Sequence, residues 1–284
     1  MIVDAQVHIW DPPSDNRRWP AGGEVRAREH IRNPFSASQL LKEMDAAGVD
    51  RAILVPPSFE GDRNDVVLAA ASDFPSRFAA MGRVPIDRPG VALRIMSDWA
   101  DHVGAIGFRF TFSAGFFASR GVSGAWLTDG TCDWAWRTAE ERSLPVMLHC
   151  PGHLDVIRDI ARRFPRLRIT VDHFGASPGA VDADVVRSVR EACALAGLEN
   201  VSVKASAGPC YTRESYPFRL MQTCVKMLYD SFGPMRVFWG SDLSRLRCSY
   251  KEALAYVAEG CEFLPSAGRR MVLGDGIRQW LAWP

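Results

Sequence analysis

The sequence has little charge imbalance, few cysteines and no long apolar run. Thirty-four lysine and arginine residues against 33 acidic residues give a formal net charge of +1, so the charge favours neither nucleic acid nor a membrane as a partner. No apolar run approaches the roughly 20 residues that span a bilayer, and Met1–Gln6 lacks the basic and apolar parts of a secretion signal. The seven cysteines have no CxxC or zinc-finger spacing, so we expect reduced thiols in a cytoplasmic protein.

Short apolar runs alternate along the chain with longer amphipathic segments. The 284 residues are 47% hydrophobic and 24% charged, which are values typical of globular proteins and exclude disordered and fibrous ones. The apolar runs, which we interpret as strands, are Ile2–His8, Val49–Pro56, Phe78–Val84, Ala105–Phe110, Pro145–Cys150, Leu167–His173, Val201–Ala205 and Arg236–Ser241. The amphipathic segments, which we interpret as helices, are Ala37–Ala47, Asp65–Asp73, Val91–Asp101, Asp133–Arg142, Leu154–Phe164, Ala183–Leu195, Phe218–Asp230 and Tyr250–Glu259.

Eight strand–helix repeats in a chain of this length predict a (β/α)8 TIM barrel, an α/β fold. A doubly wound open sheet is the main alternative, but it usually carries a glycine-rich loop after its first strand, and Ala5–Trp10 is no such loop. Three long connections, Asp11–Asn33, Thr111–Gly130 and Ser206–Pro217, follow predicted strands. We therefore expect long loops at the C-terminal face of the barrel, where they either build a substrate pocket or only cap the barrel.

Four polar residues stand at the C-terminal ends of predicted strands: His8, His149, His173 and Asp242. Strand ends converge on one rim of a barrel, so these distant residues can meet in one pocket. A single histidine at such a place is commonly structural, but three histidines with an aspartate match the ligands of a hydrolytic divalent metal.

Six short segments resemble the amidohydrolase superfamily, in its amidohydrolase-related (amidohydrolase 2) branch of lactonase-type TIM-barrel hydrolases. They occur in the order of the family and cover nearly the whole chain: Ile2–Trp10, Gly107–Arg109, Leu144–His149, Val171–Gly175, Val203–Ser206 and Trp239–Asp242. The resemblance implies that residues 1–284 form one distorted barrel domain that hydrolyses a carbonyl substrate. Relatives include lactonases and decarboxylases of aromatic acids, and they often associate, so we expect a homo-oligomer.

One position departs from the family. The first strand usually ends in His-x-His, whereas here it reads Gln6-Val7-His8. An amide oxygen is a weaker ligand than imidazole for zinc-like ions. Two alternatives therefore stay open: the site binds a divalent metal, Zn or Mn, or it works without a metal. If a metal binds, we expect His8, His149 and Asp242 as ligands, with Gln6 optional; some lactonases of this branch work without one.

We expect Asp242 to act as the general base that takes a proton from the attacking water, with burial raising its pKa toward the working range. With a metal, His173 polarises the scissile carbonyl or orients the water. Without a metal, His149, His173 and Arg109 together stabilise the oxyanion. His149, His173 and Asp242 are therefore the predicted catalytic residues.

Arg109 and Lys204 are internal cations, which need either a partner carboxylate or an anionic substrate. A salt bridge to Asp172 or Asp242 is the alternative to substrate binding. Other candidates for contact with a small, anionic substrate are His153, Tyr211 and Trp126.

Several further residues are expected to have structural roles. By strand alternation, Cys150 should face the helices and Asp172 should point away from His173 and pair with a helix. His30 is interpreted as a surface residue. The apolar C-terminal residues, Trp280–Pro284, are expected to pack under the barrel or against a second subunit.

The function these residues favour is hydrolysis of a carbonyl ester-type bond, most simply the opening of a lactone that bears an anionic group. A metal-dependent non-oxidative decarboxylase of an aromatic acid is the alternative, and a non-catalytic binding barrel is the third. Ring opening releases a proton and decarboxylation releases CO2, whereas a binding protein releases neither.

Overall fold

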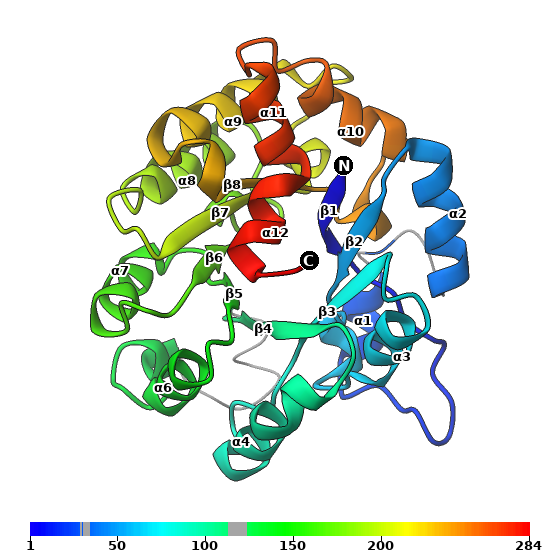
Figure 1. Ribbon diagram of the computed structural model, residues 1–284, viewed down its shortest axis with the longest axis vertical. Coiled ribbons are helices and arrows are strands. Elements are labelled where there is room, and N and C mark those ends of the chain that lie inside the picture. The colour runs from blue at the N-terminus through cyan, green and yellow to red at the C-terminus, as the bar shows by residue number, and fades with distance from the viewer. Residues whose placement is uncertain (29, 31–34, 113–123) are drawn as a thin grey trace.

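The chain folds into a ring of eight parallel strands with helices around the outside (Figure 1). A computed structural model describes residues 1–28, 30, 35–112 and 124–284. The strands are β1 (Val3–Val7), β2 (Arg51–Leu54), β3 (Phe78–Gly82), β4 (Ala105–Thr111), β5 (Val146–His149), β6 (Ile169–Val171), β7 (Val201–Ser206) and β8 (Val237–Gly240). They are paired in sequential order without a reversal point, so the predicted (β/α)8 barrel is confirmed and the doubly wound sheet was the wrong alternative.

Each of the eight predicted helical segments contains a helix. The α-helices are α1 (Gly23–Ala27), α2 (Ala37–Ala47), α3 (Asp65–Asp73), α4 (Pro89–Asp98), α6 (Asp133–Glu141), α7 (Leu154–Arg163), α8 (Ala183–Cys193), α9 (Arg219–Phe232), α10 (Tyr250–Ala258), α11 (Ser266–Arg270) and α12 (Gly276–Leu281). No helix in the described ranges is long and apolar enough to cross a bilayer.

Local sequence signals set the ends of α2. Ser36 accepts a hydrogen bond from the Gln39 backbone N–H, and the Gln39 side chain accepts one from the Ser36 N–H, so the two residues form a capping box. Gly48 ends the helix with φ 77°, a left-handed conformation that glycine adopts without strain. These signals explain why the predicted bounds of this helix, Ala37–Ala47, match the observed ones.

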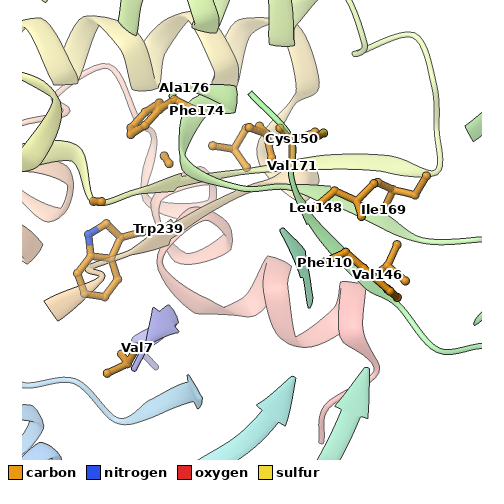
Figure 2. Close-up of a cluster of buried hydrophobic side chains, with 14 of the residues drawn as sticks. Val7, Phe110, Val146, Leu148, Cys150, Ile169, Val171, Phe174, Ala176 and Trp239 are labelled. Carbon is orange, nitrogen blue, oxygen red and sulfur yellow. The ribbon is translucent and has the colours of Figure 1, made fainter. Parts of the chain in front are cut away.

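Side chains alternate between two buried hydrophobic clusters. The larger cluster lies between the strands and the helices, and Figure 2 shows part of it, including Val146, Leu148 and Cys150 of the fifth strand region. The smaller cluster collects the opposite faces of five strands inside the barrel, for example Ile53, Met81 and Met147. Cys150 therefore faces the helices as expected, and all seven cysteines are free thiols.

The C-terminal residues close the N-terminal end of the barrel. Ile277, Leu281 and Trp283 join the inner cluster beside Val3, the first residue of β1, and α12 lies across the barrel opening (Figure 1). The first of the two alternatives for this segment, packing under the barrel, is thus confirmed. Association into a homo-oligomer stays a prediction.

A buried carboxylate joins β8 to β1. Among the described residues the strand ladder runs from β1 to β8 without a ladder between these two. Instead, Asp4 accepts hydrogen bonds from the Gln6 N–H (3.0 Å), the Ser241 N–H (2.8 Å), the Ser241 hydroxyl and the Tyr250 hydroxyl (2.6 Å). The Asp242 N–H also donates to the Gln6 carbonyl (2.9 Å). We call this set of hydrogen bonds between β1 and the residues after β8 the seam. It places Asp242 directly beside the end of β1.

Candidate active site

A pocket of about 1020 Å³ opens at the C-terminal ends of the strands. The first long loop contributes Trp19, Arg26 and His30 to its wall, as predicted. The second contributes Phe112 and Gly124, whereas Phe116 and Phe117 lie outside the described residues. The third long loop, Ser206–Pro217, contributes no residue to this pocket; Pro209, Cys210 and Thr212–Tyr216 line a neighbouring hollow instead.

The four strand-end residues meet in this pocket. His8, His149, His173 and Asp242 all line it and are each at most 6% exposed. His8 Nε2 lies 3.3 Å from Asp242 Oδ1, and the His149 and His173 rings meet edge to face at 5.4 Å. Asp242 and His173 both have positive φ angles, 53° and 52°, in sharp turns that direct their side chains into the pocket.

The side chains of β1 do not alternate strictly between the inside and the outside of the barrel. Val3 and Ala5 face the inner cluster, whereas Val7 faces the outer one. The register of β1 against β2 shifts between Asp4 and Val7, which is the mark of a bulge. The bulge allows Gln6 and His8 both to point to the interior of the barrel.

Hydrogen bonds determine the orientation of Gln6 and the tautomer of His8. Lys204 Nζ lies 2.6 Å from Gln6 Oε1, and because an ammonium only donates, the amide oxygen must face Lys204. The amide nitrogen therefore lies toward His8 Nε2, at 3.2 Å. His8 Nδ1 donates to the Val55 carbonyl (2.7 Å), so Nε2 is the acceptor of the Gln6 N–H.

Asp172 lies inside the barrel and pairs with both internal cations. Its carboxylate is 2.6 Å from Lys204 Nζ and 2.7 Å from Arg109 Nε. The expectation that Asp172 turns away and pairs with a helix was therefore wrong. The strand ends at Val171, and the left-handed turn at His173 breaks the alternation, so both Asp172 and His173 face inward.

Arg109 and His173 hold each other in place. Arg109 Nη2 lies 3.3 Å from His173 Nε2, and because a guanidinium only donates, this imidazole nitrogen is the acceptor. His173 Nδ1 then donates to the Ser206 hydroxyl at 2.8 Å. Both nitrogens of His173 are occupied by protein partners, so the ring orients the Arg109 guanidinium at the pocket wall.

Burial keeps the imidazoles neutral near pH 7. It lowers the pKa of His8 to about 4 and that of His149 to about 3, and it lowers the pKa of His173 well below its ordinary range. Burial alone would raise the pKa of Asp242, but the attraction of His8 and His173 in their protonated forms, and of the Arg245 guanidinium, outweighs burial, and the net pKa is well below the ordinary value. The expected rise in the pKa of Asp242 was therefore wrong; the carboxylate is ionised throughout the neutral range.

Of the five residues predicted to contact substrate, two line the pocket and three do not. Arg109 and His153 are part of its wall. Lys204 is fully buried in its pairing with Asp172, which is the salt-bridge alternative. Tyr211 is 1% exposed and packs against Phe174, and Trp126 packs against the outer cluster. Lys204 and Tyr211 are outside the pocket lining because they are buried in the protein interior, and Trp126 is half-buried against the outer cluster.

His30 and Glu60 are among the pocket residues that were not predicted from the sequence. His30, interpreted as a surface residue, lines the pocket, lies 5.5 Å from the His8 ring and shares a hydrogen bond of 2.6 Å with Ser244 Oγ. Glu60 follows β2 and is 3% exposed; burial raises its pKa to about 7, although Arg17 lies 3.4 Å away. Glu60 lies beyond the end of the predicted strand Val49–Pro56, so the signal that could have found it is its place in the connection that follows this strand.

The side chains around His8 do not fit a divalent metal. Gln6 presents its N–H group, not its oxygen, to His8 Nε2, and that N–H occupies the acceptor that a metal would need. Asp242 Oδ1 is a buried acceptor without a hydrogen-bond partner, so it and the His149 ring are free to ligate, but His8 Nε2 is not. The described part of the chain holds no group of three or more His, Cys, Asp or Glu side chains arranged for an ion.

Residues 3–281 match the family model described as amidohydrolase. The chain belongs to the amidohydrolase family. It is 28% identical over 295 residues to an L-fucono-1,5-lactonase of Burkholderia ambifaria, covering 96% of this chain and 92% of that one. It is 27% identical to a 4-sulfomuconolactone hydrolase of Hydrogenophaga intermedia, covering 84% and 73%. A crystal structure of an amidohydrolase from Burkholderia multivorans with bound zinc superposes with a TM-score of 0.79 at 22% identity over the whole of both chains. This protein is thus a hydrolytic enzyme of that family.

Proposed function

We propose that the protein opens a lactone ring by attack of an activated water at the C-terminal mouth of the barrel. The observation that carries the proposal is the ionised Asp242 beside a neutral His8 and opposite the oriented Arg109 guanidinium, all lining one pocket. The named activities of the two relatives, a sugar lactonase and a muconolactone hydrolase, support the same reaction class.

Asp242 is the general base in this proposal. Its Oδ1 is an acceptor without a hydrogen-bond partner, so it is free to take a proton from the attacking water and return it to the leaving ring oxygen. The Arg245 guanidinium, 3.5 Å from Oδ2, holds the other oxygen of the carboxylate. Because the carboxylate is already ionised near pH 7, no prior deprotonation step is needed.

Arg109 and His149 stabilise the charge that develops on the carbonyl oxygen. Arg109 keeps its orientation through Asp172 and His173 and presents its remaining N–H groups at the pocket wall. His149 lines the pocket and makes no side-chain hydrogen bond within the described residues, so its neutral ring can donate to the substrate. A fixed cation in a buried site stabilises an oxyanion without reorganisation at the moment of reaction. His173 is a positioning residue in this scheme.

The pocket suits a substrate with an anionic group. Five arginines line it, Arg18, Arg26, Arg88, Arg109 and Arg245, against four carboxylates, Glu60, Asp62, Asp87 and Asp242. Decarboxylation of an aromatic acid has less support, because it needs a metal to hold the carboxylate and the Gln6 amide faces His8 with its N–H group.

Proton release from lactones tests this proposal. L-Fucono-1,5-lactone and a muconolactone, the substrate types in the names of the two relatives, are added to the purified protein with a pH indicator. We expect faster ring opening of the carboxylate-bearing lactone. Release of CO2 from an aromatic acid, with no lactone opened, contradicts the proposal.

A further inference from the structure

A continuous chain of polar side chains crosses the interior of the barrel. It runs from Asp172 to Lys204 (2.6 Å), to the Gln6 oxygen (2.6 Å), and from the Gln6 nitrogen to His8 Nε2 (3.2 Å). Asp242 Oδ1 lies 3.3 Å beyond that nitrogen without a hydrogen bond to it. The members come from four different strand regions, β6, β7, β1 and β8. The contacts of Lys204 with Gln6 and of His8 with Asp242 cross from β7 and β8 to β1 and therefore depend on the barrel being closed.

Lys204 determines which groups donate and which accept along this series of hydrogen bonds. It is fully buried and donates to Asp172 on one side and to Gln6 on the other. If Gln6 turned its oxygen toward His8, its N–H groups would face the ammonium, and two donors would oppose each other in a buried site. The orientation in which Gln6 offers a donor to His8 is consequently the stable one.

We infer that Lys204, acting through Gln6, closes the position beside His8 to divalent metals, and that the buried ammonium is the resident cation of this part of the site. Two physical effects act together. The Gln6 N–H occupies the His8 lone pair, and the ammonium two contacts away repels a second cation. The inference concerns metal content and holds whichever lactone the enzyme opens.

Metal titration of the purified protein tests the inference directly. The protein is treated with a chelator, dialysed, and titrated with Zn²⁺ or Mn²⁺ by calorimetry beside the variant His8→Ala, with bound metal measured by elemental analysis. We expect both proteins to bind the same amount, since thiols and surface groups do not depend on His8. One equivalent bound at micromolar affinity or tighter by the wild type, and lost in His8→Ala, overturns the inference.

A gain of binding separates the role of Lys204 from that of Gln6. Gln6→His supplies a second imidazole but leaves the ammonium, whereas Gln6→His combined with Lys204→Gln removes the charge and keeps an N–H for Asp172. We expect the double variant to bind Zn²⁺ at least 100-fold more tightly than Gln6→His alone, and to give the visible absorption of a tetrahedral site with Co²⁺. Equal affinity of the two variants shows that Lys204 does not exclude the metal. The wild-type titration keeps the test valid if the double variant does not fold.

Discussion

At the scale of single residues, the site consists of groups whose charge and orientation are set by their neighbours. Asp242 is ionised because nearby positive charge outweighs its burial, and Arg109 is held by Asp172 and His173. The identity of these residues was predictable from their positions at strand ends. Their hydrogen-bond directions were not, because a tautomer or an amide orientation depends on partners far away in the sequence.

Asp242→Asn removes the proposed base with almost no change in shape. We expect kcat to fall by about 10³-fold, in the range of general base catalysis. Asp87→Asn, a carboxylate on the pocket wall outside the polar chain, is the control and should retain most activity. Initial-rate kinetics with a circular dichroism spectrum of each variant check this. Near-normal turnover of Asp242→Asn removes it from the base role.

Arg109→Lys keeps the positive charge but loses the forked geometry. A lysine ammonium cannot bind Asp172 and His173 and still face the pocket, so we expect kcat/KM to fall by about 10²-fold, as for the loss of one oxyanion donor. Arg88→Lys, at the rim and 61% exposed, is the matched control. If both variants lose the same activity, the orientation of Arg109 has no special part in catalysis.

At the scale of elements, the ends of strands matter more than their interiors. All eight strands and one helix after each of them were predicted, because the apolar runs and the capping signals are local, whereas α1 lies in a segment predicted as a long loop. The bulge in β1 and the left-handed turn after β6 were not predicted. They decide which side chains reach the pocket, and this is why Asp172 was assigned to the wrong side of its strand.

Asp4→Asn tests the seam between β1 and β8. The Asp4 carboxylate accepts hydrogen bonds from several N–H and O–H groups. An asparagine at this position would turn its own N–H group toward some of these donors, so they would lose their acceptor. Leaving buried donors unpaired costs about 3 kcal/mol of unfolding free energy. Tyr250→Phe removes a single bond of the seam and should cost about 1 kcal/mol. Urea denaturation measures both, and an unchanged Asp4→Asn midpoint rules out this account of the closure.

At the scale of the whole molecule, folding moves several ionisable groups out of water and makes stability depend on pH. Four histidines, His8, His30, His149 and His173, have lowered pKa values in the folded protein, chiefly through burial. Burial raises the pKa of Asp4 to about 6 and that of Glu60 to about 7, which acts in the opposite direction. The histidines are the larger group and decide the sign.

We expect stability to be greatest near neutral pH and to fall as the pH drops from about 6.5 toward 4. In this window the unfolded chain takes up a proton on each of the four histidines, whereas the native protein takes up protons on Asp4 and Glu60. The net uptake of about two protons on unfolding corresponds to about 3 kcal/mol per pH unit near pH 5.

Thermal unfolding followed by tryptophan fluorescence between pH 7 and pH 4.5 measures this dependence. In His30→Asn one of the titrating groups is absent. The number of protons taken up on unfolding, which sets the slope of stability against pH, should therefore decrease by about one. A midpoint that stays constant over this range contradicts neutral burial of the imidazoles.

The sequence by itself determined the barrel, the family and the four polar strand ends, because apolar periodicity, helix capping and position along a strand are local properties. Only the tertiary structure decided which hydrogen bonds and ion pairs those polar groups form. Lys204 pairs with Asp172 and turns Gln6, and Gln6 in turn occupies His8, through contacts between residues up to 198 positions apart. The contact between Lys204 and Gln6 exists only when the barrel closes, and closure also removes the water that would otherwise pair with these buried donors.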